Sequence, residues 1–212
     1  ASIPFYLFSQ AALNLNAGTM SVLNGTTPLF SFIIATVWLK LNTNLVQLMG
    51  ILIGIIGLVI FVGYESLEFS LFALMLCLGA SFLYAFSSNF IFKTQSIDAT
   101  YLAAMTLLFA TFLVFPFTFL ETGLHLNHSN EVLLSVFLLG FACTGLAYMG
   151  YVVLIKRAGP VRASTVVLIV PISGMLWANL FLNEVITLTM LLGCLLIITG
   201  VGLINFFQKE SN

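Results

Sequence analysis

Long apolar stretches separated by short polar groups run through the whole chain, and this pattern predicts its secondary structure. A membrane-spanning helix needs about 20 mainly apolar residues, and these stretches reach that length. They do not alternate apolar and polar residues, as the strands of a membrane β-barrel do. The pattern therefore predicts eight membrane-spanning helices, at residues 2–17, 19–41, 44–63, 69–92, 99–120, 131–156, 162–183 and 187–207.

The stretch VLNGTTPLFSF, residues 22–32, interrupts the second predicted helix with a polar run before Pro28. Pro28 has no N–H, and its ring crowds the carbonyl four residues back, so it breaks the helical hydrogen bonds near Asn24. In a bilayer the freed backbone groups must be satisfied by protein or by a water-filled cavity. Asn24, Thr26 and Thr27 can bond to them locally, so the stretch predicts a helix interruption that lines a cavity. A simple kink, with Thr and Asn only joining helices, is the alternative.

The interruption belongs to an internal repeat. A shift of 143 residues superposes one proline and two glycines on their counterparts: Pro28 on Pro171, Gly50 on Gly193 and Gly57 on Gly200. The second and third predicted helices thereby map onto the seventh and eighth, so five helices separate the copies. An odd number inverts one copy relative to the membrane, which is the plan of many secondary transporters.

The repeat predicts the domain organisation. We expect an all-α membrane bundle of two inverted five-helix repeats, of which about eight of ten helices are present. Residues 1–63 would form the last three helices of the first repeat, residues 69–207 the complete second repeat, and residues 208–212 a cytoplasmic tail. On this count, two further helices precede residue 1 in the parent protein.

The composition agrees with a membrane protein and excludes other classes. The chain is 61% hydrophobic and 6% charged, and its mean hydropathy is +1.17, whereas a soluble domain carries roughly 25% charged residues. The net charge of −1 provides no basic patch for nucleic acid. Cys77, Cys143 and Cys194 lie far apart in apolar runs, so we expect them to be small buried hydrophobic residues.

The few charges predict the orientation. All six basic residues follow even-numbered predicted helices: Lys40, Lys93, Lys156, Arg157, Arg162 and Lys209. Because Lys and Arg are enriched on the cytoplasmic side, we expect the C-terminus to be cytoplasmic and the loop with His125 and His128 to be outside.

Four segments carry a resemblance to a known family: AGTMSVLNGTTPLFSFIIATVWL (17–39), LMGILIGIIGLVIFVG (48–63), AGPVRASTVVLIVPISGMLWANLFLNEV (158–185) and LLGCLLIITGVGLI (191–204). With them the chain resembles a drug/metabolite transporter of the EamA type. The resemblance implies a ten-helix bundle in a bacterial inner membrane that moves, and by expectation exports, a small organic solute by alternating access. It also implies an acidic residue at a helix end in each half. Glu184 holds that position in the second copy, whereas the first copy has Leu41.

Polar and aromatic side chains within the predicted helices are the candidate solute-binding residues. On a continuous helix, four of them share one face: Asn24, Thr27, Ser31 and Trp38. Five others lie in further predicted helices: Tyr84, Asn89, Tyr148, Trp177 and Asn179. Packing or anchoring at the membrane surface is the alternative for each. We expect Pro28, Pro171 and Glu184 to act in helix breaking and gating, and the solute to be amphipathic, such as an amino acid.

Other functions are less well supported by the sequence. The two histidines lie in the predicted outer loop, so neither metal chemistry nor histidine-activated catalysis within the membrane is favoured. We therefore expect no enzyme activity, no metal and no cofactor, and only the solute and the bilayer as partners. A passive channel or a non-transporting membrane subunit remains the alternative, although a channel would need rings of charges or carbonyls. The sequence does not indicate an oligomeric state.

Overall fold

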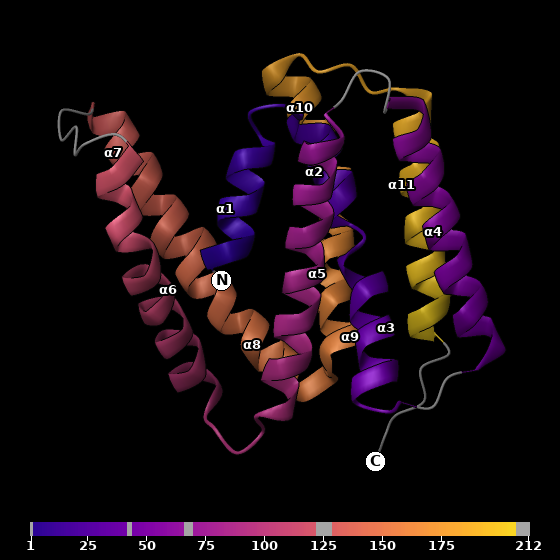
Figure 1. Cartoon of the computed structure of the whole chain (residues 1–212), viewed down its shortest axis with the longest axis horizontal. Coiled ribbons are helices and arrows are strands. Elements are labelled where there is room, and N and C mark those ends of the chain that lie inside the picture. The colour runs from indigo at the N-terminus through magenta and orange to yellow at the C-terminus, as the bar shows by residue number, and fades with distance from the viewer. Residues whose placement is uncertain (1, 42–43, 66–69, 122–128, 207–212) are drawn as a thin grey trace.

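The computed structural model describes residues 2–41, 44–65, 70–121 and 129–206, and these form a helical bundle without any strand (Figure 1). The elements follow in this order: α1 (Ser2–Ala11), α2 (Ala17–Asn24), α3 (Thr27–Trp38), α4 (Leu45–Glu65), α5 (Leu71–Lys93), α6 (Ala99–Glu121), α7 (Asn130–Leu138), the π-helix η1 (Leu139–Leu146), α8 (Ala147–Ala158), α9 (Pro160–Ser164), the 3₁₀-helix η2 (Thr165–Leu168), α10 (Ile169–Leu182) and α11 (Leu188–Phe206).

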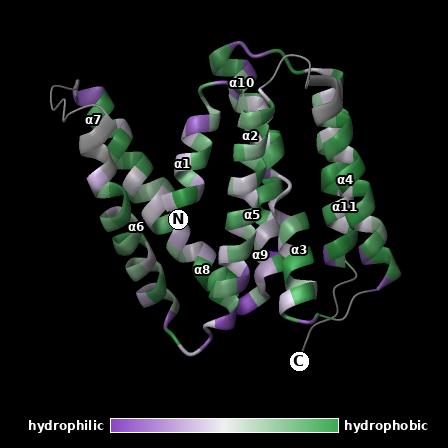
Figure 2. Cartoon of the chain, in the orientation of Figure 1, coloured by the Kyte–Doolittle hydropathy of each residue, from purple (hydrophilic) through white to green (hydrophobic). Residues whose placement is uncertain are grey.

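Apolar residues cover these helices along their length, and polar residues gather near their ends (Figure 2). Within the described residues, six helical segments are long and apolar enough to cross a membrane: Ala17–Trp38, Leu71–Lys93, Ala99–Pro116, Asn130–Ala158, Pro160–Leu182 and Leu188–Phe206. The apolar stretch Leu45–Phe61 of α4 is shorter. The prediction of an all-α membrane bundle is confirmed.

The first predicted helix is shorter than expected. It ends at Ala11 rather than at residue 17, and α2 begins directly after Asn16. The Asn16 side chain accepts a hydrogen bond of 2.7 Å from the Thr19 N–H. This is the interaction of a helix N-cap, which the hydropathy pattern alone did not separate from the preceding apolar residues.

The predicted helix interruption is confirmed. The chain leaves α2 after Asn24 and enters α3 at Thr27, with Pro28 in the first turn of α3. The Thr27 hydroxyl donates to the Asn24 carbonyl at 2.7 Å, and the Thr26 hydroxyl donates to the Leu23 carbonyl at 2.6 Å. The Thr27 hydroxyl therefore bonds to the Asn24 carbonyl, whose helical donor is missing because Pro28 has no N–H. The Leu23 carbonyl also accepts from the Thr26 N–H at 3.1 Å. At the corresponding place in the second copy, the α-helix changes to the tighter 3₁₀-helix η2 shortly before Pro171.

Helices α4 and α11 pack against each other through paired glycines. A Cβ placed on Gly50 would lie 2.6 Å from the Gly200 carbonyl oxygen, and one placed on Gly57 would lie 2.9 Å from the Gly193 carbonyl oxygen. The helices are thus antiparallel and touch through their backbones. The 143-residue shift relates Gly50 to Gly193 and Gly57 to Gly200. The contact of Gly50 with Gly200 therefore corresponds, by the repeat, to the contact of Gly193 with Gly57. That is the arrangement expected for two inverted copies.

The two helix breaks also meet. A Cβ placed on Gly25 would lie 2.6 Å from Cγ of Pro171, and one placed on Gly174 would lie 2.6 Å from Oγ of Ser21. Contacts of α2 with α10 and of α3 with α9 surround this crossing. The breaks therefore face each other as expected, but their side chains fill the space between them.

Helices α6 and α7 lie at the edge of the bundle opposite the α4–α11 pair (Figure 1). Residues of η1 are accordingly more exposed than those of the central helices. Cys77 and Cys194 are buried, whereas Cys143 in η1 is exposed, so the expectation of burial was wrong for Cys143. His125, His128 and the tail after Phe206 lie outside the described residues.

Candidate functional site

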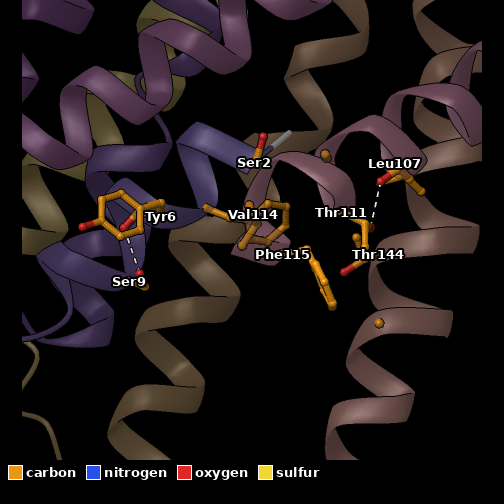
Figure 3. A pocket seen from close by; sticks show the side chains of 11 residues that line it. Ser2, Tyr6, Ser9, Leu107, Thr111, Val114, Phe115 and Thr144 are labelled. Atoms are coloured by element: carbon orange, nitrogen blue, oxygen red, sulfur yellow. Dashed lines mark hydrogen bonds between the residues drawn. The ribbon is translucent and has the colours of Figure 1, made fainter. Parts of the chain in front are cut away.

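Two neighbouring cavities lie beside α1. The larger has a volume of about 690 Å³ and is lined by residues of α1, α6 and η1 (Figure 3): Ser2, Phe5, Tyr6, Ser9, Leu107, Ala110, Thr111, Val114, Phe115, Gly140 and Thr144. The smaller has a volume of about 280 Å³ and is lined by residues of α1, α2 and α5: Phe5, Phe8, Met20, Ser21, Asn24 and Tyr84. Phe5 belongs to both linings, so the two cavities adjoin.

Both cavities lie at the middle depth of the bundle. Thr111 is near the centre of α6 (Ala99–Glu121), and Thr144 is at the centre of the continuous helix from Asn130 to Ala158. Asn24 directly precedes the break near the middle of the segment Ala17–Trp38. Secondary transporters hold their solutes at this depth, beside interrupted helices.

The smaller cavity brings together two residues predicted from the sequence, Asn24 and Tyr84. The Tyr84 ring stacks on Phe8 with centroids 6.1 Å apart and meets Phe5 edge-on at 6.3 Å. The half-buried Asn24 amide accepts a hydrogen bond of 3.2 Å from the Thr27 hydroxyl. This cavity therefore combines aromatic walls with one amide.

The larger cavity is lined by residues that the sequence analysis did not select. None of them is charged, and their polar atoms are the hydroxyls of five residues: Ser2, Tyr6, Ser9, Thr111 and Thr144. The sequence feature that could have indicated them is a single threonine near the centre of an apolar helix, as at Thr111 and Thr144. Gly140 and Thr144 line the cavity from the π-helix η1, and a π-helix has no comparable signature in the sequence.

Ser31 and Asn89 form a buried link between α3 and α5 instead of lining either cavity. Both residues are fully buried. The Asn89 amide donates to the Ser31 carbonyl and hydroxyl at 3.2 Å each, and to the Ala85 carbonyl at 2.9 Å. The helix is interrupted before Thr27, and the Thr27 hydroxyl bonds to Asn24. The four residues predicted from a continuous helix therefore do not form one face toward a cavity.

The Asn89 link predicts a graded loss of stability. Interhelical hydrogen bonds in membranes contribute about 0.6 kcal/mol on average and up to about 1.7 kcal/mol. We therefore expect Asn89→Ala to lower the melting temperature by about 2–6 °C, measured by thermal unfolding in detergent. Ser31→Ala should have a smaller effect, because the Ser31 and Ala85 carbonyls still accept from Asn89.

Asn205→Ala is the matched control for this prediction. Among the residues that the structure describes, the Asn205 amide donates only within its own helix, to the Val201 carbonyl at 2.9 Å. If it lowers the melting temperature as much as Asn89→Ala, the link between α3 and α5 has no special contribution.

Trp38 lies at one end of the bundle among aromatic and basic residues. Its ring stacks on Phe86 at 5.2 Å, and Nζ of Lys93 lies 5.0 Å from its centroid. At the same end, Lys156 Nζ donates to the carbonyls of Thr94, at 2.9 Å, and Ile97. This environment is typical of an anchor at the membrane surface.

Tyr148 continues the polar surface of η1 into α8. Its hydroxyl is buried near the side chains of Ser87 and Thr106, and no hydrogen bond of ordinary geometry to it is found among the described residues. Tyr151, three residues further along, places its hydroxyl 3.2 Å from the Ser88 hydroxyl. Tyr151 thus joins α8 to α5 by a hydrogen bond, whereas Tyr148 is buried beside residues of α5 and α6.

Trp177 and Asn179 lie apart from both cavities. Trp177 is 58% exposed, and its ring lies 5.4 Å from that of Phe181. The Asn179 amide donates to the Glu184 carbonyl at 2.9 Å. Asn183 ends α10 in the left-handed conformation, with φ of 55°. Together these two asparagines shape the turn that carries Glu184.

Glu184 connects this turn to the other half of the molecule. Its two carboxylate oxygens accept hydrogen bonds from the N–H groups of Ala17, at 3.0 Å, and Gly18, at 2.9 Å. These N–H groups open α2, where a negative charge is stabilised by the helix dipole and the bonds are strengthened by the charge. We call this interaction the carboxylate clamp.

The carboxylate clamp occurs in only one half. At the positions related by the repeat, Leu41 replaces Glu184 and Pro160 replaces Ala17. Leucine has no acceptor, and proline has no N–H to donate. The acceptor and one of the two donors are therefore missing from the corresponding place, where Val161 at the position of Gly18 keeps its N–H.

No group of three or more His, Cys, Asp or Glu residues that could hold a metal ion occurs in the described ranges. The polar groups of the site are hydroxyls and amides, which bind organic molecules by hydrogen bonding. An all-α membrane bundle with repeated helix interruptions beside a cavity at middle depth is the architecture of a multi-pass membrane transporter.

The chain belongs to the EamA-like transporter family, whose model matches residues 1–63 and 71–206. The resemblance read from the repeated segments is therefore confirmed.

Individual relatives agree with this assignment. The uncharacterized transporter YvbV of Bacillus subtilis is 22% identical over 212 residues, which cover 98% of this chain and 69% of YvbV. The uncharacterized transporter YoaV of the same organism is 27% identical, covering 91% of this chain and 68% of YoaV. A crystal structure with 14% sequence identity has the same fold, with a TM-score of 0.70 over 97% of this chain and 72% of the other.

Proposed function

We propose that this transporter moves a small organic solute across the membrane by alternating access, with one repeat rocking against the other, and that it exports the solute. The observation that carries the proposal is the pair of glycine contacts that the repeat exchanges, Gly50 with Gly200 and Gly57 with Gly193. Because the contacts are equivalent in the two repeats, the outward-open and inward-open states can have similar energies. Each repeat adopts in one state the conformation that the other repeat has in the other state.

The carboxylate clamp is the proposed gate. It joins the start of α2 in one repeat to the turn after α10 in the other. By the positive-inside rule the basic end of the bundle is cytoplasmic, so the clamp lies on the outer side. Breaking its two hydrogen bonds would release the outer ends of the repeats. At the cytoplasmic end the repeats are joined by a neutral hydrogen bond, from the Gln47 amide to the Ile204 carbonyl at 3.2 Å.

Cysteine accessibility tests this mechanism without a known solute. We would replace Cys77, Cys143 and Cys194 by alanine and introduce Thr144→Cys in the larger cavity. A membrane-impermeant maleimide should label this cysteine from either side of oriented vesicles. Phe112→Cys is the control, because Phe112 is 73% exposed on the apolar surface of the neighbouring α6 and should stay unlabelled.

A cross-link across the clamp separates the possible mechanisms. Joining Asn16→Cys to Val185→Cys with a bifunctional reagent before labelling should block labelling from the outside and leave labelling from the cytoplasm. Labelling from both sides after cross-linking would instead indicate a channel. Labelling from one side in every condition would indicate a protein that does not alternate.

A further inference from the structure

We propose that the larger cavity binds an amine, a solute with N–H donors on a positively charged nitrogen and an apolar body. This inference rests on the proposed transport function for its biological meaning, and it names the class of solute. It comes from the direction in which three of the five hydroxyl groups of the cavity, those of Ser9, Thr111 and Thr144, make their hydrogen bonds.

Three hydroxyls of the lining donate their protons to their own helices. The Ser9 hydroxyl donates to the Tyr6 carbonyl at 2.8 Å, and the Thr111 hydroxyl to the Leu107 carbonyl at 3.0 Å (Figure 3). In the π-helix, the Thr144 hydroxyl donates to the Leu139 carbonyl, five residues back, at 2.9 Å. A hydroxyl has one proton and two lone pairs. These three groups therefore offer a solute only acceptors.

The rest of the lining favours the same kind of solute. It contains no Lys, Arg or His to balance a carboxylate or a phosphate and no Asp or Glu to balance an ammonium, so the acceptors and the aromatic rings decide which solute is favoured. The rings of Phe5 and Tyr6 lie on the α1 side, and aromatic faces attract cations. A primary ammonium group carries three N–H donors, which match the three hydroxyl acceptors of the lining.

Three related probes test the class of solute. They share a phenyl body and differ in the polar group: 2-phenylethylammonium, its N,N,N-trimethyl derivative, and phenylacetate. Binding of each to the purified full chain in detergent would be measured by equilibrium dialysis and competition. We expect the primary ammonium to bind, the trimethyl derivative to bind at least about tenfold more weakly because it has no N–H, and phenylacetate not to compete.

Two threonine substitutions test the site. Thr111→Val combined with Thr144→Val keeps the shape and removes two acceptors, so we expect about tenfold weaker binding of 2-phenylethylammonium with an unchanged melting temperature. Thr199→Val is the matched control. The Thr199 hydroxyl also donates to a carbonyl four residues back, that of Leu195 at 2.6 Å, but Thr199 does not line the cavity.

Several results would overturn the inference: no binding of the primary ammonium, equal binding of the trimethyl derivative, competition by phenylacetate, or full affinity in the double-valine variant. Failure of the transport proposal would look different. If the labelling of Thr144→Cys alternates between the two sides and the amine does not bind, the solute class is wrong and the transport proposal stands. If the amine binds and labelling does not alternate, the mechanism is wrong and the solute class stands.

Discussion

Gly200→Ala is expected to leave little folded protein, whereas Gly202→Ala, two residues further along the same helix, should be tolerated. A Cβ at position 200 would lie 2.7 Å from the Gly54 backbone nitrogen and closer still to the Gly50 carbonyl oxygen. Backbone atoms cannot change rotamer to relieve the clash, so α4 and α11 must separate. Overpacking costs typically about 1–3 kcal/mol, and we expect a value at or above the upper end.

The measurement is the monodisperse fraction in size-exclusion chromatography, together with the melting temperature of whatever protein remains. Gly202 is the appropriate control because a Cβ there would meet no atom within 4 Å. Equal behaviour of the two variants would show that α4 and α11 are not held together through the paired glycines.

Glu184→Gln is expected to weaken the carboxylate clamp, the proposed outer gate. The carboxamide has one acceptor oxygen where the carboxylate has two, so one of the N–H groups of Ala17 and Gly18 loses its partner, and the charge at the start of α2 is lost. Hydrogen bonds to charged groups contribute about 1.5–3 kcal/mol each. We therefore expect the balance between closed and open outer gates to shift by about tenfold or more toward open.

The shift can be measured with Met20→Cys, which lies one turn inside the clamp on the wall of the smaller cavity. In the cysteine-free background, Glu184→Gln should raise its labelling rate from the outside by about the same factor. Glu131→Gln is the control, because Glu131 is exposed in the first turn of α7. An unchanged rate in Glu184→Gln would mean that the clamp only stabilises the fold.

The positions of the helices could be predicted from the sequence because bilayer thickness sets the length of each apolar stretch. The break at Pro28 could also be predicted, because a missing N–H has the same consequence in any helix. The contact of Gly50 with Gly200 was not predicted, because the repeat relates Gly50 to Gly193 and does not say which helices touch.

The location of the site was harder to predict for physical reasons. Ser31 and Thr144 both carry a hydroxyl group. Only tertiary packing decides that the Ser31 hydroxyl bonds to Asn89 while Thr144 faces the cavity. The π-helix changes which residues of the helix share a face, and hydropathy does not report it. The partners of Glu184 are backbone N–H groups more than 160 residues away, which no pattern of side chains reveals.

The separation of the cavities from the α4–α11 pair has a consequence for how such proteins diversify. Helices α4 and α11, the proposed pivot, contribute no side chain to the lining of either cavity. Under the proposed mechanism, substitutions in the helices that line the two cavities, α1, α2, α5, α6 and η1, can change which solute binds while the backbone contacts between α4 and α11 stay unchanged.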